Sequence, residues 1–419
     1  MTPTTPAATA DIDPVRSRTG LTRLGSGLFL GALAWAVPLL CFGMVLLPAK
    51  LADLAPDDKV SLVALFTIAS SIVSLVTNIV FGTLSDMTRS RFGRRNPWVV
   101  SGALAASVII VFMSVTQSIA WLLVGYCCLA AAMNAVIAVL VAMIPDRVPT
   151  ERRGSVSAAS GVGVLIGGTI GALVGAMFVD DPDLGMAVLA PWPCLMALAC
   201  VALTADFSNR HVPRVPFSRA QLLAAVSFPR RAPDFYWAFA GRFLIILGYY
   251  VVSAYQLYIL TDYIGLSDAE SAAVITSAAV INLITAVIGS AVFGPLSDRL
   301  GRRKVPVIVA SGLIGLGVLV PALSPSSWTI LVFAGIAGLG LGAFFAVDAA
   351  LITEVLPTQH SRAKDLGILN MATTGGQMIA PGVGSLVVGA GLGFAPVFLI
   401  AFAICMLGGL AILPIKSVR

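Results

Sequence analysis

Apolar stretches of helix length, separated by short polar segments, follow one another from residue 25 almost to the C-terminus. A helix that spans a membrane needs about 20 predominantly apolar residues. Backbone groups facing lipid must be hydrogen-bonded within their own segment, so apolar runs of this length are predicted to be helices. The pattern predicts an all-α membrane protein with 12 transmembrane helices, at 25–48, 60–84, 97–117, 119–144, 156–179, 186–205, 235–260, 271–296, 305–323, 328–355, 366–390 and 393–414.

Composition supports a membrane protein and argues against several other classes. Hydrophobic residues make up 58% and charged residues 11% of the chain, whereas a soluble domain has about 25% charged residues. The net charge of +6 could indicate a nucleic-acid-binding protein. The basic residues lie between apolar runs, however, so we expect the chain to contact a lipid bilayer and no nucleic acid. The six cysteines lie in apolar segments without a Cys-x-x-Cys pair, and both histidines lie in predicted loops. We therefore expect no metal site and no cofactor, and an enzyme is disfavoured because no nucleophile–base pair or phosphate-binding loop is present.

The distribution of lysine and arginine predicts the orientation. Of the 26 basic residues, 23 fall in segments on one side of the predicted membrane, namely both ends of the chain and every second connection. Basic residues accumulate on the cytoplasmic side of a membrane. We therefore predict a protein of the cytoplasmic (inner) membrane with both termini in the cytoplasm. The N-terminal segment lacks the apolar core of a signal peptide, which predicts a disordered tail followed by a retained helix.

A motif occurs twice, 212 residues apart. Gly82-Thr-Leu-Ser-Asp86, followed by Gly93-Arg-Arg, returns as Gly294-Pro-Leu-Ser-Asp298, followed by Gly301-Arg-Arg. A second pair of acidic residues, Asp146 and Glu354, ends the fourth and tenth predicted helices at an offset of 208. The repeats predict a tail at 1–24, a six-helix bundle at 25–205, a linker at 206–234, a six-helix bundle at 235–414 and a tail at 415–419.

The repeated acids and arginines are predicted to form a cytoplasmic gate in each half. A carboxylate at the C-terminal end of a helix opposes the helix dipole by about 0.3–1 kcal/mol, and an arginine at the start of the next helix would compensate. The gate residues are Asp86, Arg94, Arg95 and Asp146 in the first half, and Asp298, Arg302, Arg303 and Glu354 in the second. The alternative is that these arginines serve only as orientation signals.

The two motif copies resemble the Gly-x-Leu-x-Asp…Gly-Arg-Arg signature of the major facilitator superfamily, and the resemblance covers essentially the whole chain. The first copy has six residues between Asp86 and Gly93, four more than between Asp298 and Gly301. This longer form resembles the glycoside–pentoside–hexuronide (melibiose permease) symporters and the sucrose transporters. The resemblance implies two six-helix halves that rock about a central site to give alternating access.

Two charged residues lie well inside predicted helices, Arg242 in the seventh and Asp348 in the tenth. An ionisable group there costs about 2.5–3.5 kcal/mol and marks a candidate functional site. We expect the two to pair. Asp348 would take and release a coupling proton, with Arg242 favouring its ionised form in one state; the alternative is a static salt bridge.

Neutral polar and aromatic residues are the candidates for a substrate cavity. Arg242, Tyr249, Ser253 and Gln256 are spaced to share one helix face. The full set is Trp35, Asn134, Tyr249, Tyr250, Ser253, Tyr255, Gln256, Asn282, Asn370, Thr374 and Gln377. Aromatic rings and amides suit a hydroxyl-rich ligand, although each group taken singly is better explained as a helix–helix contact.

The chain is therefore predicted to be a monomeric secondary transporter that imports a small molecule, a sugar or glycoside, by proton symport. The alternative is proton-coupled efflux of drugs or metabolites. Efflux proteins of the superfamily carry a Gly-Pro pair in the fifth helix, where this chain has Gly168-Thr169. A channel or receptor-like scaffold is disfavoured because a repeated gate implies two opposed states.

Overall fold

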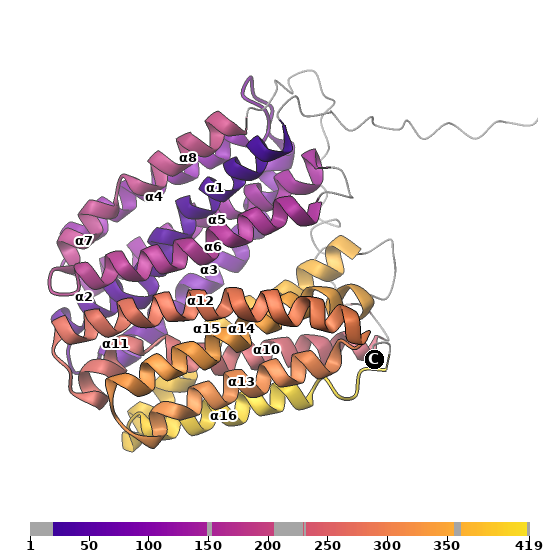
Figure 1. Cartoon of the computed structure of the whole chain (residues 1–419). Helices are drawn as coiled ribbons and strands as arrows, with labels where there is room; N and C mark the ends of the chain where they lie inside the picture. Colours follow the sequence, from indigo (N-terminus) through magenta and orange to yellow (C-terminus); the bar gives the residue numbers. More distant parts are fainter. Residues whose placement is uncertain (1–19, 149–152, 205–228, 230–231, 356–361, 417–419) are drawn as a thin grey trace, which may run out of the picture.

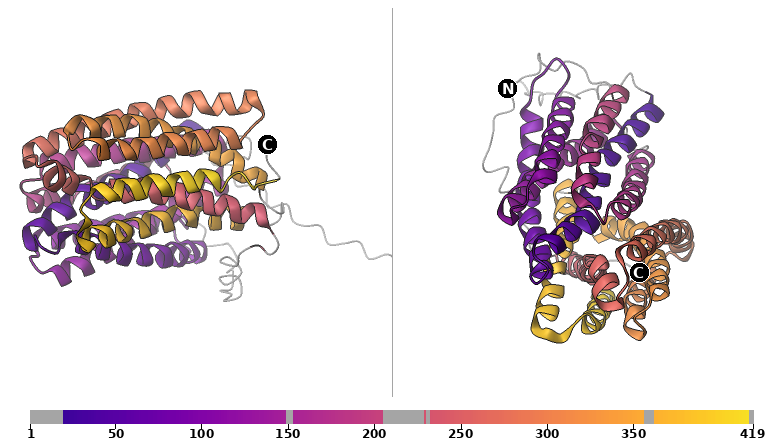
Figure 2. Two further views of the ribbon diagram at one scale, coloured as in Figure 1. Left: turned by 90° about the horizontal axis from the view of Figure 1, so that it is seen from below. Right: turned by 90° about the vertical axis from the view of Figure 1, so that its left-hand side faces the viewer.

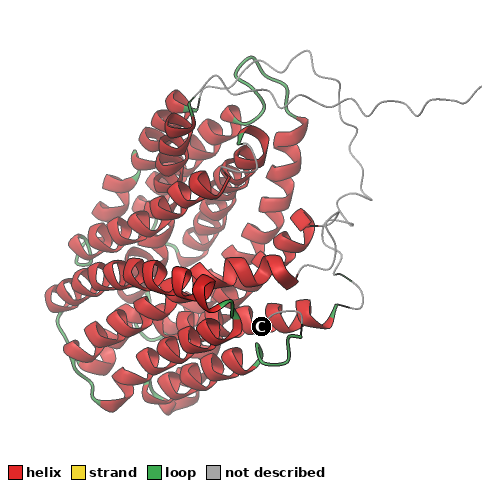
Figure 3. Ribbon diagram, turned by 45° about the vertical axis from the view of Figure 1, so that its right-hand side comes forward, coloured by secondary structure: helices red, strands yellow, loops and turns green. Residues whose placement is uncertain are grey.

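The computed structural model describes residues 20–148, 153–204, 229, 232–355 and 362–416. Most of the predicted tail 1–24 and linker 206–234 therefore lies outside the described residues. The described part is helical throughout, without a strand (Figure 3). The predicted all-α fold is confirmed.

The first half contains the helices α1 Leu21–Cys41, which continues through η1 Phe42–Leu46 into α2 Leu47–Leu54, then α3 Lys59–Met87, α4 Asn96–Val115, α5 Ile119–Arg147, α6 Arg153–Met177, α7 Pro182–Leu189 and α8 Trp192–Leu203. The second half contains α10 Pro233–Ser253, α11 Gln256–Tyr258, η3 Ile259–Ile264, α12 Asp268–Leu300, α13 Lys304–Leu323, α14 Ser327–Val355, α15 Arg362–Val387, η4 Val388–Leu392 and α16 Ala395–Leu410. Within the described residues, 11 helical stretches are long and apolar enough to cross a membrane, and α16 is a shorter apolar helix.

Two predicted helices are interrupted. The sixth is divided between α7 and α8 at Ala190 and Pro191, because proline has no N–H to continue the hydrogen-bond ladder. The seventh ends at Ser253, and Tyr255 leaves the helical conformation with φ −112° and ψ 19°. The prediction that Gln256 shares a helix face with Arg242 is therefore wrong, because the break falls between them.

The same helix pairs pack in both halves (Figure 1). In the first half α1 packs on α6 and α8, while α5 packs on α3 and α4. In the second half α10 packs on α15 and α16, while α14 packs on α12 and α13. Viewed along the helices, the two halves form two bundles side by side (Figure 2).

The two halves meet through α3 with α15 and through α6 with α12. We call the end of the bundles that carries the Gly-Arg-Arg segments the motif end, and the other the opposite end. At the opposite end one buried cluster joins both halves, with Val45 and Leu46 beside Tyr255 and Tyr258. Toward the motif end each half has its own buried cluster, around Leu24 in the first and Phe235 in the second. The ribbons of α6 and α12 accordingly diverge toward the motif end (Figure 1).

Candidate functional site

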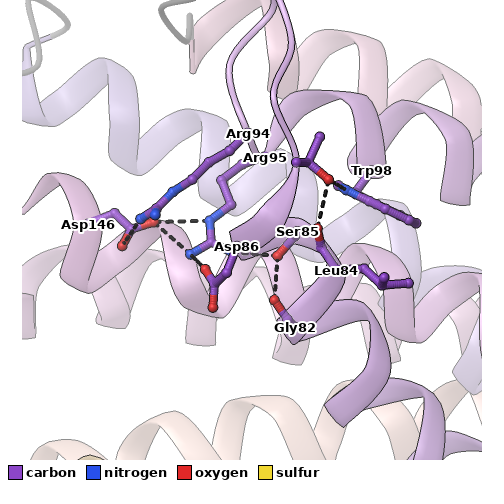
Figure 4. A network of polar contacts seen from close by, with 9 residues as sticks. Gly82, Leu84, Ser85, Asp86, Arg94, Arg95, Trp98 and Asp146 are labelled. Carbon is purple, nitrogen blue, oxygen red and sulfur yellow. Dashed lines mark hydrogen bonds and ion pairs between the residues drawn. The ribbon is translucent and has the colours of Figure 1, made fainter. Parts of the chain in front are cut away.

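At the motif end of the first half, three helix ends meet around Arg95 (Figure 4). Arg95 lies at the start of α4. Its Nη2 is 2.6 Å from Asp86 Oδ1, in the last turn of α3, and 2.9 Å from Asp146 Oδ2, in the last turn of α5. Arg94 Nη2 lies 2.6 Å from the other oxygen of Asp146. The structure thus brings together all four gate residues predicted for this half, and the two arginines offset two carboxylates at helix C-termini.

Arg95 is 3% exposed, so its guanidinium needs partners on every side. Its Nη1 donates to Ser85 Oγ, and Ser85 donates to the carbonyl of Gly82 at 2.8 Å. Gly93 adopts φ +82°, a conformation that glycine reaches without the steric cost of a side chain. The Gly, Ser and Arg of the motif therefore act as one unit that turns the chain and buries Arg95.

The second half repeats part of this arrangement. Arg303 Nη1 donates to Ser297 Oγ at 3.0 Å, and Ser297 donates to the Arg302 carbonyl at 3.0 Å. Gly301 again has a positive φ, +58°. The Arg302 side chain is exposed. The side chains of Asp298 and Glu354 lie outside the described residues, so the carboxylates of this gate stay a prediction.

The two charges inside the helices lie together. Arg242 Nη1 on α10 is 2.8 Å from Asp348 Oδ2 on α14; the Asp348 side chain is buried and the Arg242 side chain is largely covered, with exposed fractions of 6% and 11%. Arg242 Nε donates to Thr373 Oγ1 on α15 at 2.7 Å. Three helices of the second half are joined at this point.

Aromatic side chains and an amide gather on the same half, around Tyr249. The rings of Tyr249 and Tyr250 lie edge to face with centroids 5.2 Å apart, and Phe333 lies 6.0 Å from Tyr249. Asn282 Nδ2 donates to the Ala334 carbonyl at 3.3 Å and lies 3.5 Å from the Tyr249 hydroxyl. The structure thus brings together Tyr249, Tyr250 and Asn282 of the predicted cavity residues, and their role in binding a ligand stays a prediction. Ser253 is buried at the end of the same helix.

In the first half, Asn134 is buried and accepts a hydrogen bond from Asn78 Nδ2 at 3.2 Å, while its own amide donates to the Ala130 carbonyl at 2.8 Å. Trp35 is partly buried against the neighbouring apolar clusters. On α15, Thr374 and Gln377 are partly buried. The side chain of Asn370 lies outside the described residues.

Tyr255 does not join the other cavity candidates. It is 1% exposed at the opposite end, and its hydroxyl lies 2.6 Å from the Pro381 carbonyl and 3.2 Å from the Val60 carbonyl of the first half. These contacts hold Tyr255 between helices in this conformation. Gln256 is partly buried just beyond the helix break.

Two further contacts close the opposite end, and sequence reasoning missed them. Lys59 of α3 lies 2.7 Å from Asp262 Oδ2 of η3, with its ammonium 4.8 Å from the centre of the Tyr258 ring. The Tyr258 hydroxyl donates to the Pro48 carbonyl at 2.9 Å. The opposite charges of the outer loops were a usable signal, but nothing in the sequence specified which residues would meet.

Other missed residues had weak signals. Ser85 and Ser297 occur at the same place in both motif copies, and Asn78 is the single amide of α3. Thr373 had no signal apart from being a hydroxyl next to the predicted Thr374. These side chains are ordinary in type, and their partners come from other helices.

A family model described as the Major Facilitator Superfamily matches residues 24–274 and 238–418. The tetracycline resistance protein, class C, of Escherichia coli is 26% identical over a match that covers 73% of this chain and 76% of that protein. The D-xylose transporter of Levilactobacillus brevis is 36% identical and the arabinose-proton symporter of Bacillus subtilis 37% identical, each over 18% of this chain. The matched part spans 16% of the length of each of these two relatives.

Solved structures share the fold at low identity. The nucleoside transporter NupG has a TM-score of 0.72 at 13% identity, with 94% of this chain and 99% of that chain covered. A bacterial homolog of the human lysosomal transporter Spinster, inward-facing and unoccupied, has a TM-score of 0.63 at 16% identity, with 94% of each chain covered. The family match over both halves and the shared fold lead to one conclusion: this chain belongs to the Major Facilitator Superfamily and is a multi-pass membrane protein.

Proposed function

We propose that the chain is a secondary active transporter that takes up a sugar or glycoside together with protons by alternating access. The observation that carries this proposal is the Arg242–Asp348 ion pair inside the helices. Ionisable residues within membrane helices are costly and rare, and they therefore mark functional sites. The likeness of the longer motif to the melibiose and sucrose transporter group supports a sugar. We expect a monomer in the cytoplasmic membrane, with the motif end facing the cytoplasm.

Protons would couple to transport through Asp348. Arginine keeps its charge under all physiological conditions, so the carboxylate is the member of the pair that changes protonation. While the pair is intact, the adjacent cation favours the ionised carboxylate; when the two separate in a dry site, the neutral acid is favoured. A conformational change that opens and closes the pair would thereby take up a proton on one side and release it on the other.

The conformation of the protein is consistent with such a cycle. At the opposite end the halves share one buried cluster, whereas toward the motif end each has its own. If the motif end faces the cytoplasm, as proposed, this arrangement would correspond to a state open toward the cytoplasm. Rocking the halves the other way would require the contacts of Lys59 and Tyr258 to break.

The sugar is proposed on two grounds. Tyr249, Tyr250 and Phe333 offer ring faces, and Asn282 offers an amide, which together suit a ligand with an apolar ring face and hydroxyl groups. Two of the relatives are named as a D-xylose transporter and an arabinose-proton symporter. Pentoses are therefore the first substrates to assay.

Efflux is the second candidate. The relative with the longest coverage among those described, over 73% of this chain, is named a tetracycline resistance protein. The buried pair would serve either direction, because proton influx drives uptake by symport or extrusion by antiport. Direction of flux separates the two: a deletion strain that loses growth on one sugar supports uptake, and one that gains only sensitivity to a compound supports efflux.

The decisive measurement is accumulation of radiolabelled D-xylose or arabinose in proteoliposomes under an imposed pH gradient. We expect Asp348→Asn to abolish accumulation against a gradient while sugar exchange at equal concentrations continues, because the asparagine cannot carry a proton. Asp57→Asn, at an exposed loop position, is the matched control and should leave accumulation unchanged. Full gradient-driven accumulation by Asp348→Asn would show that the proton role is wrong.

A further inference from the structure

Two of the contacts of the Arg242 guanidinium come from two different helices. Its Nη1 meets Asp348 on α14 at 2.8 Å, and its Nε donates to Thr373 on α15 at 2.7 Å. A guanidinium is a rigid planar fork, so contact at one nitrogen still allows it to swing, whereas contacts at two nitrogens define its plane. Thr373 therefore determines where Nη1 points.

The backbones of α10 and α15 approach closely at this level. A Cβ built on Gly376 would lie 2.9 Å from the Phe243 carbonyl oxygen and 3.0 Å from the Leu247 nitrogen, whereas one on the neighbouring Gly375 would meet the Phe243 ring at 3.4 Å. Small residues permit such close crossings. Gly376 is thus what allows α15 to bring the Thr373 hydroxyl within reach of Arg242.

The helix that carries Thr373 also reaches the other half of the molecule, since α15 packs against α3. A movement of the halves that displaces α15 would change the orientation of Arg242 through Thr373. We infer that Thr373 is a positioning residue that aims Arg242 at Asp348 and so links the protonation of Asp348 to the position of α15. This inference rests on the proposed role of the Arg242–Asp348 pair.

Among the described residues, the other charged side chains of the helices around Asp348 lie near the helix ends. The helices packed against α14 are α10, α12 and α13, and the ionic contact described for Asp348 is with Arg242. The remaining charged side chains described on these three helices lie in their terminal turns: Asp234, Asp268, Glu270, Arg299 and Lys304.

The experiment uses purified full-length protein and needs no substrate. The infrared band of the protonated Asp348 carboxyl, identified by its loss in Asp348→Asn, is followed during a pH titration. A hydrogen bond to a charged group is lost in Thr373→Val, so we expect the titration midpoint to move by about one pH unit toward higher pH. Thr373→Ser keeps the hydroxyl and should titrate as the original protein does. An unchanged midpoint in Thr373→Val would overturn the inference.

A second pair of variants covers the case in which Thr373→Val does not fold. Gly376→Ala should displace α15 and shift the midpoint in the same direction, whereas Gly375→Ala should leave it unchanged. Equal midpoints for these two variants would also overturn the inference.

Failure of the proposed function would be separately visible. If the band shifts in Thr373→Val but vesicles containing the original protein show no proton-dependent flux, the positioning role stands and the transport proposal falls. If flux is proton-dependent but the midpoint does not move, the transport proposal stands and the role of Thr373 falls.

Discussion

Two adjacent arginines of the same motif occupy different environments. Arg95 has a side chain that is 4% exposed and contacts two carboxylates and a serine, whereas Arg94 is 39% exposed and contacts Asp146. Truncating Arg95 removes a buried guanidinium that joins three helix ends, although Asp86 is 57% exposed and Asp146 keeps its contact with Arg94. A partly exposed pair contributes about 0–1 kcal/mol. The repeated motif identified both arginines but could not rank them.

We therefore expect Arg95→Ala to lower the midpoint of thermal unfolding in detergent clearly, and Arg94→Ala to leave it nearly unchanged. The loss in Arg95→Ala has its origin in the three helix ends, which its guanidinium would no longer join. Comparable midpoints for the two variants would mean that the burial of Arg95 does not stabilise the helix ends.

Basic residues outside the two gates also make defined contacts with helix ends. Arg147 Nη1 donates to the Thr204 carbonyl at the end of α8 at 2.8 Å. Lys304 Nζ lies 3.5 Å from the Leu413 carbonyl just beyond α16. Arg147 thus caps α8, where a cation interacts favourably with the helix dipole, whereas Lys304 holds the segment that follows α16.

At the scale of the element, the glycines of α6 form a stripe against α1. The stripe consists of Gly163, Gly167, Gly171 and Gly175, four residues apart, and a Cβ on Gly171 would lie 2.7 Å from the Val37 carbonyl oxygen. The sequence shows the high glycine content of this helix, and small residues permit close helix crossings. It did not separate the packed glycines from Gly161, which has no other side chain or backbone of another segment within 4 Å.

Gly171→Ala is expected to destabilise the protein by about 1–3 kcal/mol, as overpacking of a close contact does. Gly161→Ala, in the same helix, should be neutral or slightly stabilising because alanine favours helix. The fraction of monodisperse protein in size-exclusion chromatography and the thermal midpoint measure both. Equal behaviour of the two variants would contradict the close α1–α6 contact.

At the scale of the whole molecule, the described hydrogen bonds and ion pair that join the halves lie at the opposite end. They connect Lys59 with Asp262, Tyr255 with Val60 and Tyr258 with Pro48. A state open on that side would have to break them. Their strength therefore contributes to the balance between the two states of an alternating-access cycle.

Reversing the charge of Lys59 tests whether its ion pair with Asp262 affects the equilibrium between the two states. Lys59→Asp places two carboxylates together and should shift the population toward separation of the halves at the opposite end, read as a longer distance between spin labels at residues 57 and 269. The double variant Lys59→Asp/Asp262→Lys should restore the shorter distance. If Lys59→Asp leaves the distance distribution unchanged, the ion pair does not influence the equilibrium.

The sequence by itself determined the helical fold, the repeat of the halves and the composition of the first gate. Lipid allows few backbone structures, so long apolar runs become helices whatever their neighbours are. The helix breaks were harder to predict from the sequence. Pro191 indicates the break between α7 and α8, whereas no sequence signal marks the end of α10 at Ser253, which lies next to the tertiary contact of Tyr255.

The tertiary structure decided which side chains meet. The Arg242–Asp348 pair was expected because these are the two charges well inside predicted helices, but Thr373 is separated from Arg242 by 131 residues and no local pattern encodes that contact. The closure of the opposite end by Lys59, Tyr255 and Tyr258 likewise depends on how two bundles lie against each other. Helix formation in a membrane is a local property of the chain, whereas pairing between helices depends on their rotation and depth, which only the packed molecule defines.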